Sequence, residues 1–237
     1  MDGSAEDPGP PETARAVARQ RWRLVLARAA DVPGLAGREL TEAWETAVAG
    51  SGLPLYQPVG RARGRVAFGA PLAADIAAER ELADIVLTDL LPVWQVREAV
   101  SRCAPPGWRL VDLFDVWLGE RSLAGQVVAA DYRIELDGAD ASVVTAAAAA
   151  LMAAVRLPRE RQKGGGNVAY DLRPLIVRVT ASSTDASVVV HARTRFDPVR
   201  GTGRPDEVVA ALGDLGGTPL ATASIVRERL LLADDPA

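Results

Sequence analysis

The segment Val127-Val-Ala-Ala-Asp-Tyr-Arg-Ile-Glu-Leu136 has a clean strand pattern, from which the rest of the fold can be traced. Every second residue is apolar, as in a strand that buries one face; these are Val128, Ala130, Tyr132, Ile134 and Leu136. An alanine-rich helix is predicted next, with Asp140 as its cap and Val155 near its end. The small side chains of this helix indicate close packing on a sheet.

The second half of the chain continues in the same manner. Two strands are predicted at residues 170–179 and 187–196, a helix at 204–213 and a closing strand at 223–232. The order β-α-β-β-α-β is that of the ferredoxin-like split fold, in which two helices cover one face of an antiparallel sheet.

The first half gives the same order. Its strands are predicted at residues 22–27, 81–87 and 108–118, with two short strand candidates at 53–57 and 65–68, and its helices at 38–49 and 92–103. We therefore expect an α+β protein made of two tandem ferredoxin-like units with antiparallel sheets. The first unit would span residues 21–119 and the second 122–233. Residues 1–20, whose start is acidic and proline-rich, are expected to form a disordered tail.

Composition restricts the possible chemistry. The chain has 237 residues, a net charge of −4, one cysteine and one histidine. Iron-sulfur and zinc sites need more cysteine or histidine ligands than this, so we expect no metal and no cofactor. Cys103 is predicted to be a buried, inert thiol. His191 is predicted to lie opposite the apolar face of its strand, beside Arg193 and Arg195, where it is either solvated or in contact with nucleic acid.

No membrane segment is expected. The longest uncharged apolar run, Ala141 to Val155, is shorter than the roughly 20 residues that a spanning helix needs. The start of the chain lacks the pattern of a secretory signal. These observations favour a cytoplasmic protein.

Basic residues occur in local groups although the chain as a whole is acidic, so any nucleic-acid contact must be local. The candidate RNA or anion site consists of Arg156, Arg159, Arg161, Lys163, Arg193, Arg195 and Arg204. The first four lie beside a triple glycine. The alternative interpretation is that they are solvated surface residues without a binding role. A second basic loop contains Arg61, Arg63 and Arg65. The segment Gly201-Thr202-Gly203-Arg204-Pro205 leads into a helix start that either holds an anion or forms a structural cap.

Several acidic residues are also candidates. Asp171 and Arg173 flank Leu172 and would point to the same side of an ideal strand, either as a structural ion pair or as a binding pair for a polar partner. Asp131, Asp171 and Asp206 are candidates for acid-base catalysis, although no spacing specifies a catalytic pair.

Four longer segments carry a resemblance to a known family. They are Leu53-Pro54-Leu55 with Ala70-Pro71-Leu72 and Glu81-Leu82-Ala83-Asp84-Ile85; Asp115-Val116-Trp117 with Ala129-Ala130-Asp131-Tyr132-Arg133; Tyr170-Asp171-Leu172-Arg173-Pro174-Leu175-Ile176; and Gly201-Thr202-Gly203-Arg204-Pro205-Asp206-Glu207-Val208. From about Trp22 to Leu232, the chain resembles a divergent member of the uncharacterised radical-SAM-linked protein family. The motif positions are Asp131, Tyr132, Asp171, Arg173, Pro205 and Asp206. The chain departs from the family at Gly34-Leu35-Ala36-Gly37, where a Ser-His-Leu-Asp helix start is usual, and at Val59-Gly60-Arg61-Ala62, which replaces a Gly-Phe-Asn-Pro turn.

The resemblance implies a partner, because members of this family are encoded beside or fused to a radical SAM protein with a cobalamin-binding-like region. A radical SAM centre needs a three-cysteine motif, and this chain has one cysteine. The leading hypothesis is therefore a non-catalytic accessory module that helps a radical SAM protein hold RNA or another macromolecular substrate. The alternatives are a free-standing RNA-binding module and an enzyme that uses carboxylate acid-base chemistry.

Overall fold

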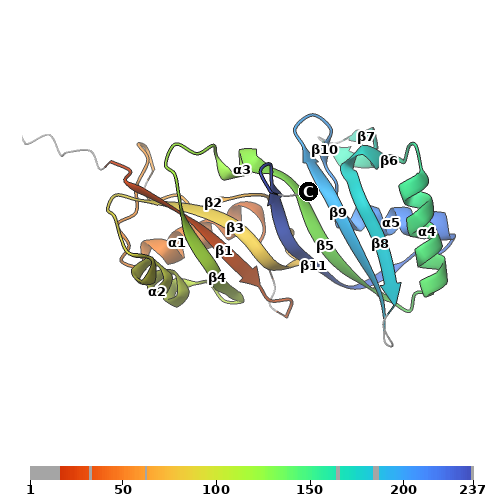
Figure 1. Cartoon of the computed structure of the whole chain (residues 1–237), viewed down its shortest axis with the longest axis horizontal. Helices are drawn as coiled ribbons and strands as arrows, with labels where there is room; N and C mark the ends of the chain where they lie inside the picture. Colours follow the sequence, from red (N-terminus) through yellow and green to blue (C-terminus); the bar gives the residue numbers. More distant parts are fainter. Residues whose placement is uncertain (1–16, 32–33, 62, 164–165, 184–186, 236–237) are drawn as a thin grey trace, which may run out of the picture.

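The structure is a computed structural model that describes residues 17–31, 34–61, 63–163, 166–183 and 187–235. Most of the expected tail, 1–20, lies outside these ranges. The described part is a mixed protein with one large, mostly antiparallel sheet and a few helices (Figure 1).

The chain forms eleven strands and five helices among the described residues. The strands are β1 (Gln20–Arg28), β2 (Ala67–Phe68), β3 (Ala77–Leu87), β4 (Trp108–Val116), β5 (Val127–Asp137), β6 (Pro158–Lys163), β7 (Gly166–Asp171), β8 (Ile176–Ser183), β9 (Val188–Asp197), β10 (Gly201–Thr202) and β11 (Ala221–Leu232). The helices are α1 (Gly37–Ala49), α2 (Val93–Cys103), α3 (Leu123–Gln126), α4 (Ala141–Ala153) and α5 (Pro205–Gly216), with a 3₁₀ turn η1 (Arg173–Leu175).

The two halves of the chain share a single sheet. Among the described residues it is nine-stranded, in the order β10-β9-β5-β11-β3-β1-β4, with β8 also paired to β9 and β2 to β3. Neighbouring strands are antiparallel except β11 and β3, which run parallel and pair at Val226 with Ala77 and at Arg227 with Ala78. The expectation of two separate sheets is therefore wrong, because this short parallel contact joins them.

Helices from both halves cover one face of the sheet. In the first half, Leu40, Trp44 and Val48 of α1 pack with the apolar side chains of β1 and β3. In the second half, α4 and α5 pack on β5, β8 and β9, with Leu151 and Leu212 fully buried. The opposite face, which we call the open face, carries the alternate residues of the strands. The cores thus follow the apolar periodicities of the sequence.

The region between α4 and β8 differs from expectation. Residues 170–179 do not form one strand, because β7 ends at Asp171, η1 follows, and β8 begins at Ile176. The basic segment before them forms β6, which pairs with β7 as a separate two-stranded sheet. We call this the β6–β7 hairpin. Apart from Pro158, β6 consists of charged and polar residues and has no apolar face, so periodicity did not reveal it.

Smaller differences occur in the first half. The expected strand at 53–57 is reduced to a single bridge between Leu55 and Leu87, and the one at 65–68 to β2. The other predicted helices and strands form, with their ends shifted by a few residues. No helix in the described ranges has the length and apolar character needed to cross a membrane.

Candidate functional site

A pocket of about 500 Å³ opens where the two halves meet on the helix-covered face. We call it the seam pocket. Its walls come from the start of α1, the segment before β3, strands β5 and β11, and the start of α5. Four residues singled out in the sequence line it together: Tyr132, Arg204, Pro205 and Asp206.

A buried ion pair lies at the base of the seam pocket. Arg227 is 2% exposed and Glu81 is 0% exposed. Arg227 Nη2 donates to Glu81 Oε2 at 2.5 Å, Nε donates to Oε1, and Nη1 donates to the carbonyl of Pro71 at 2.8 Å. Burial alone would lower the pKa of Arg227, but the charge and hydrogen bonds of Glu81 raise it above its ordinary value. Arg227 therefore stays charged, and the pair links β3 of one half to β11 of the other.

Tyr132 adds a hydroxyl to the base of the pocket. Its side chain is 3% exposed and lines the pocket together with Arg227. Burial raises the pKa of Tyr132 above its ordinary value, against the opposing effect of Arg227. Tyr132 therefore keeps its hydroxyl proton at neutral pH.

Two helices begin at the rim of the seam pocket. α1 begins after Ala36 and α5 after Arg204, and neither start has a side-chain cap. Gly203 lets the segment before α5 pack against η1 and β9, because a Cβ there would lie 2.6 Å from the carbonyl oxygen of Leu175 and 2.9 Å from the Cβ of Thr194. The Gly201–Pro205 segment therefore does lead into a helix start, as predicted, and leaves first-turn amides without side-chain partners.

Three residues of the seam pocket region were missed in the sequence, namely Arg28, Glu81 and Arg227. A charged residue in a strand is usually exposed, so these three were not expected to be buried. A signal was present for Glu81, which is in phase with Ala83 and Ile85 on the buried face of β3. A charge in phase with a core face is a candidate for a buried functional or structural pair.

The basic residues near the β6–β7 hairpin contact neighbouring side chains. Arg159 forms an ion pair with Asp214 of α5. The guanidinium of Arg161 lies 5.0 Å from the ring centroid of Tyr170, whose pKa is raised by burial and by Glu207. Arg156, after α4, is exposed and lies 3.8 Å from Asp171. The side chain of Lys163, and Gly164 and Gly165 of the triple glycine, lie outside the described residues.

Other predicted cations lie on the open face of the sheet. Arg193 makes two bonds to Asp131, at 2.7 and 3.1 Å, and Arg229 makes a third at 2.9 Å. Burial opposes ionisation of Asp131, but the bonds from both arginines lower its pKa below its ordinary value. His191 is half-exposed on this face, as predicted, 3.9 Å from Glu228. Arg195 is exposed. The described members of the proposed RNA site are thus spread over the hairpin, the open face and the seam pocket.

Asp171 and Arg173 do not pair as predicted, because η1 interrupts the strand. Asp171 Oδ1 accepts from the amides of Leu157 and Arg173. The guanidinium of Arg173 donates to the carbonyls of Met152, Ala154 and Ile176. It closes the C-terminal end of α4, where helix carbonyls lack partners. Both residues stabilise a junction and do not face the seam pocket.

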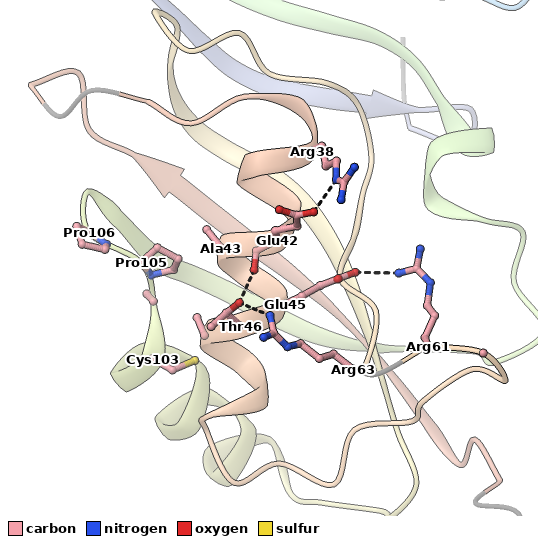
Figure 2. A pocket seen from close by; sticks show the side chains of 13 residues that line it. Arg38, Glu42, Ala43, Glu45, Thr46, Arg61, Arg63, Cys103, Pro105 and Pro106 are labelled. Atoms are coloured by element: carbon pink, nitrogen blue, oxygen red, sulfur yellow. Dashed lines mark hydrogen bonds and ion pairs between the residues drawn. The ribbon is translucent and has the colours of Figure 1, made fainter.

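A second hollow, a groove of about 1000 Å³, lies beside α1 (Figure 2). Arg61 binds Glu45 at 3.1 Å, Arg63 donates to the Thr46 hydroxyl at 2.6 Å, and Arg38 donates to Glu42 at 2.6 Å, as the dashed lines show. The arginines of the second basic loop that line this groove are therefore held by α1.

The thiol of Cys103 is partly buried, and no metal-ligand cluster forms among the described residues. Cys103 lies at the edge of the groove in Figure 2, half-buried, and burial raises the pKa of its thiol. Over the residues that the structure describes, no group of three or more histidine, cysteine or carboxylate side chains is arranged to hold a metal.

The tryptophans divide into core and surface. Trp22, Trp44 and Trp108 are buried, with Trp44 and Trp108 in an edge-to-face contact at 5.8 Å. Trp94 is 64% exposed and Trp117 is 75% exposed. Trp94 lies in the first turn of α2, away from the buried Val96 and Val100.

Similar solved structures are distant. A chain in a crystal structure of a Cbf5-Nop10-Gar1 complex has a TM-score of 0.46 and 7% identity, over 87% of this chain and 49% of that chain. A chain in the archaeal box H/ACA sRNP Nop10-Cbf5 complex gives a TM-score of 0.40 and 8% identity, over 86% and 46%. This chain therefore spans about half the length of these two. An unknown protein from Galdieria sulphuraria gives a TM-score of 0.24 and 13% identity, over 90% and 99%.

The family to which the chain is matched is described as an uncharacterized protein conserved in bacteria (DUF2344). No curated protein matches the chain. The family match covers residues 21–200, which include Tyr132 and Glu81 of the seam pocket region but end before α5 and β11. Since the match covers most of the sequence, the chain belongs to this family of uncharacterized proteins conserved in bacteria.

Proposed function

We propose that this chain is a non-catalytic binding module that holds a ligand in the seam pocket on behalf of a partner protein. The observation that carries the proposal is that both halves of the chain build the pocket, from the start of α1 on one side and the start of α5 on the other. A concave, partly apolar hollow with a few polar groups at its base is the usual form of a ligand site.

The positions of the three carboxylates named from the sequence do not support an acid-base pair among them. Asp131 lies on the open face, bound to two arginines. Asp171 is engaged by backbone amides, and of the three only Asp206 lines the seam pocket. A general acid and base must both reach the reacting group, and these three carboxylates do not share one pocket.

The partner class comes from the resemblance to the radical-SAM-linked family. A chain with one cysteine would leave cluster chemistry to that partner. The proposal is tested by gel filtration of this chain with the radical SAM protein encoded beside it, over a range of concentrations. Co-migration is expected, and separate migration at every concentration would contradict a stable partnership.

RNA could be the macromolecular substrate in such an assembly. The spread of the arginines over three regions favours contact shared with the partner over binding by this chain alone. A free-standing RNA module would instead bind RNA without the partner, with an affinity that falls steeply as salt is raised. Filter binding of single-stranded RNA at increasing salt concentration separates the two cases.

We also infer that each half is a ferredoxin-like unit. The strand neighbours in the first half run β4-β1-β3-β2, and those in the second half run β11-β5-β9-β8. In both, the first strand lies between the fourth and the third. This common order supports a duplicated architecture in which the β6–β7 hairpin is an addition to the second unit.

A blocked pocket tests the ligand-binding function directly. Ala73 is exposed and lines the seam pocket, whereas its neighbour Ala74 is exposed and does not. Ala73→Trp should fill the pocket, and Ala74→Trp is the matched control. Compounds found by ligand-observed NMR to bind the wild type should bind Ala74→Trp and fail to bind Ala73→Trp. Equal binding to both variants would place the ligand elsewhere and refute the proposal.

A further inference from the structure

Buried charge beside the seam pocket is unbalanced. Two buried arginines, Arg28 at 4% and Arg227 at 2% exposure, stand against one buried glutamate, Glu81. Glu81 forms an ion pair with Arg227. Within the described ranges, Arg28 has no carboxylate in ion-pair contact, and its guanidinium donates to the carbonyls of Leu35, Ala73 and Ile76. The charges of Glu81 and Asp75 offset only part of the effect of burial on Arg28, whose pKa stays below its ordinary value, so this region favours an additional anion.

The seam pocket adjoins this region, although Arg28 itself lines two neighbouring hollows and not the seam pocket. Ala73 and Ile76, whose carbonyls bind Arg28, both line it. Arg227 lines it as well, whereas Glu81 does not. The base of the pocket therefore presents the cationic side of the buried pair.

Tyr132 supplies a hydrogen-bond donor at the same place. It lines the pocket together with Arg227, so its hydroxyl is placed to donate to an acceptor there. Burial raises the pKa of Tyr132 and keeps the hydroxyl proton in place. Arg204 and the hydroxyl of Thr202 add donors nearer the surface.

The rest of the lining limits the ligand in size and charge. Apolar side chains form much of the wall, namely Leu72, Ile76, Phe196 and Ile225. Asp75 and Asp206 also line the pocket but are exposed, so they lie at its rim, where solvent screens them. These carboxylates would disfavour a large polyanion more than a ligand with one anionic group at its inner end. A volume of about 500 Å³ suits a small molecule.

From this combination we propose that the seam pocket binds a small organic anion, with its carboxylate or phosphate group beside Tyr132 and Arg227 and its apolar body against Leu72, Ile76 and Phe196. The proposal deepens the ligand-binding function proposed above and rests on it. Carboxylate and phosphate are both acceptors for the same donors, and the test below compares them.

A series of probes with one phenyl body and different head groups tests the charge preference. Benzoate, phenyl phosphate, benzamide and benzylamine are titrated into the full chain while the backbone amide signals of Gly37, Gly203 and Asp206 are followed by NMR. We expect benzoate and phenyl phosphate to shift these signals, and benzamide and benzylamine to leave them unchanged at the same concentrations. The tighter of the two anions identifies the head group.

Matched variants test the named donors. Tyr132→Phe should raise the dissociation constant of the tighter anion about tenfold, as expected for one lost hydrogen bond to a charged group. Tyr170→Phe removes a hydroxyl outside the pocket and should leave binding unchanged. Arg204→Gln, at an exposed position, should also weaken binding, whereas Arg200→Gln should not. The Arg204 pair keeps the test decisive if Tyr132→Phe does not fold.

Each contrary result has a distinct meaning. Equal shifts of the three amide signals by benzamide or benzylamine would overturn the anion preference and leave the pocket as a ligand site. An absence of shifts with all four probes at millimolar concentration would overturn both proposals. Unchanged anion affinity in both Tyr132→Phe and Arg204→Gln would overturn the assigned binding mode.

Discussion

Replacement of Glu81 by glutamine would leave the buried Arg227 beneath the seam pocket without its carboxylate partner. Glu81→Gln keeps the size of the side chain and removes its charge. Glu81 is 0% exposed, so solvent cannot replace it as a partner for Arg227. Breaking one partner of a buried pair costs about 3–5 kcal/mol. Arg28, close enough for its charge to interact with Glu81, adds to the imbalance.

The same strand provides a matched control. Glu79 is two residues away on β3, and its side chain is 47% exposed. Its partner Arg133 also binds Glu228, so Glu79→Gln leaves that arginine with a carboxylate. An exposed pair of this kind contributes about 1 kcal/mol at most. The two glutamate-to-glutamine changes should therefore differ by roughly 3 kcal/mol.

Urea unfolding at neutral pH, followed by circular dichroism, measures the difference. With a denaturant slope of about 3 kcal/mol per molar, Glu81→Gln should lower the midpoint by about 1 M more than Glu79→Gln. The double variant Glu81→Leu with Arg227→Met should recover most of the loss, because it removes both charges together. Equal midpoints for Glu81→Gln and Glu79→Gln would refute the reasoning.

Three further changes test other parts of the molecule. Arg173→Met removes three bonds to carbonyls around the end of α4 and should lower the melting temperature by roughly 5–10 °C, whereas the exposed Arg156→Met should have little effect; equal melting temperatures would contradict the capping role. Asp131→Asn should lower the free energy of unfolding by a constant amount above about pH 5, and by less as pH falls below about 4. The reason is that the pKa of Asp131 is lower in the folded than in the unfolded chain, so its stabilising effect is complete above the unfolded-state pKa and is lost as pH falls through the folded-state pKa. Urea unfolding from pH 3 to 7 checks this, and a pH-independent difference would contradict it. Gly201→Ala introduces a side chain at φ +99°, 3.2 Å from the guanidinium of Arg161, and should cost about 1 kcal/mol in urea unfolding, while Gly166→Ala, which meets nothing within 4 Å, should be nearly neutral; equal costs would argue against strain at residue 201.

Periodicity was enough to place most helices and strands. The apolar spacing of α1, α2 and α5 and the alternation in β1, β5 and β9 reflect burial of one face, which is a local property of the sequence. Periodicity does not predict that the two halves share one sheet. The shared sheet depends on a parallel contact between residues 77–78 and 226–227, and strand patterns do not specify partners so distant in the chain.

The candidate site was partly visible in the sequence. Tyr132 and the segment 204–206 were singled out from the resemblance, and the structure brings them to one pocket. Arg28, Glu81 and Arg227 were missed, because a charged residue in a strand is usually exposed and only its phase with the core marks it as buried. Arg173 was misread because the turn η1 breaks the strand geometry on which its pairing with Asp171 was predicted.

A crystal structure of the chain soaked with phenyl phosphate would test most directly whether the seam pocket is the ligand site. We expect the phosphate group within hydrogen-bond distance of Tyr132 Oη, with the ring against Phe196 and Leu72. Phenyl phosphate bound instead in the groove beside α1, among Arg38, Arg61 and Arg63, with the seam pocket free of it, would contradict this account.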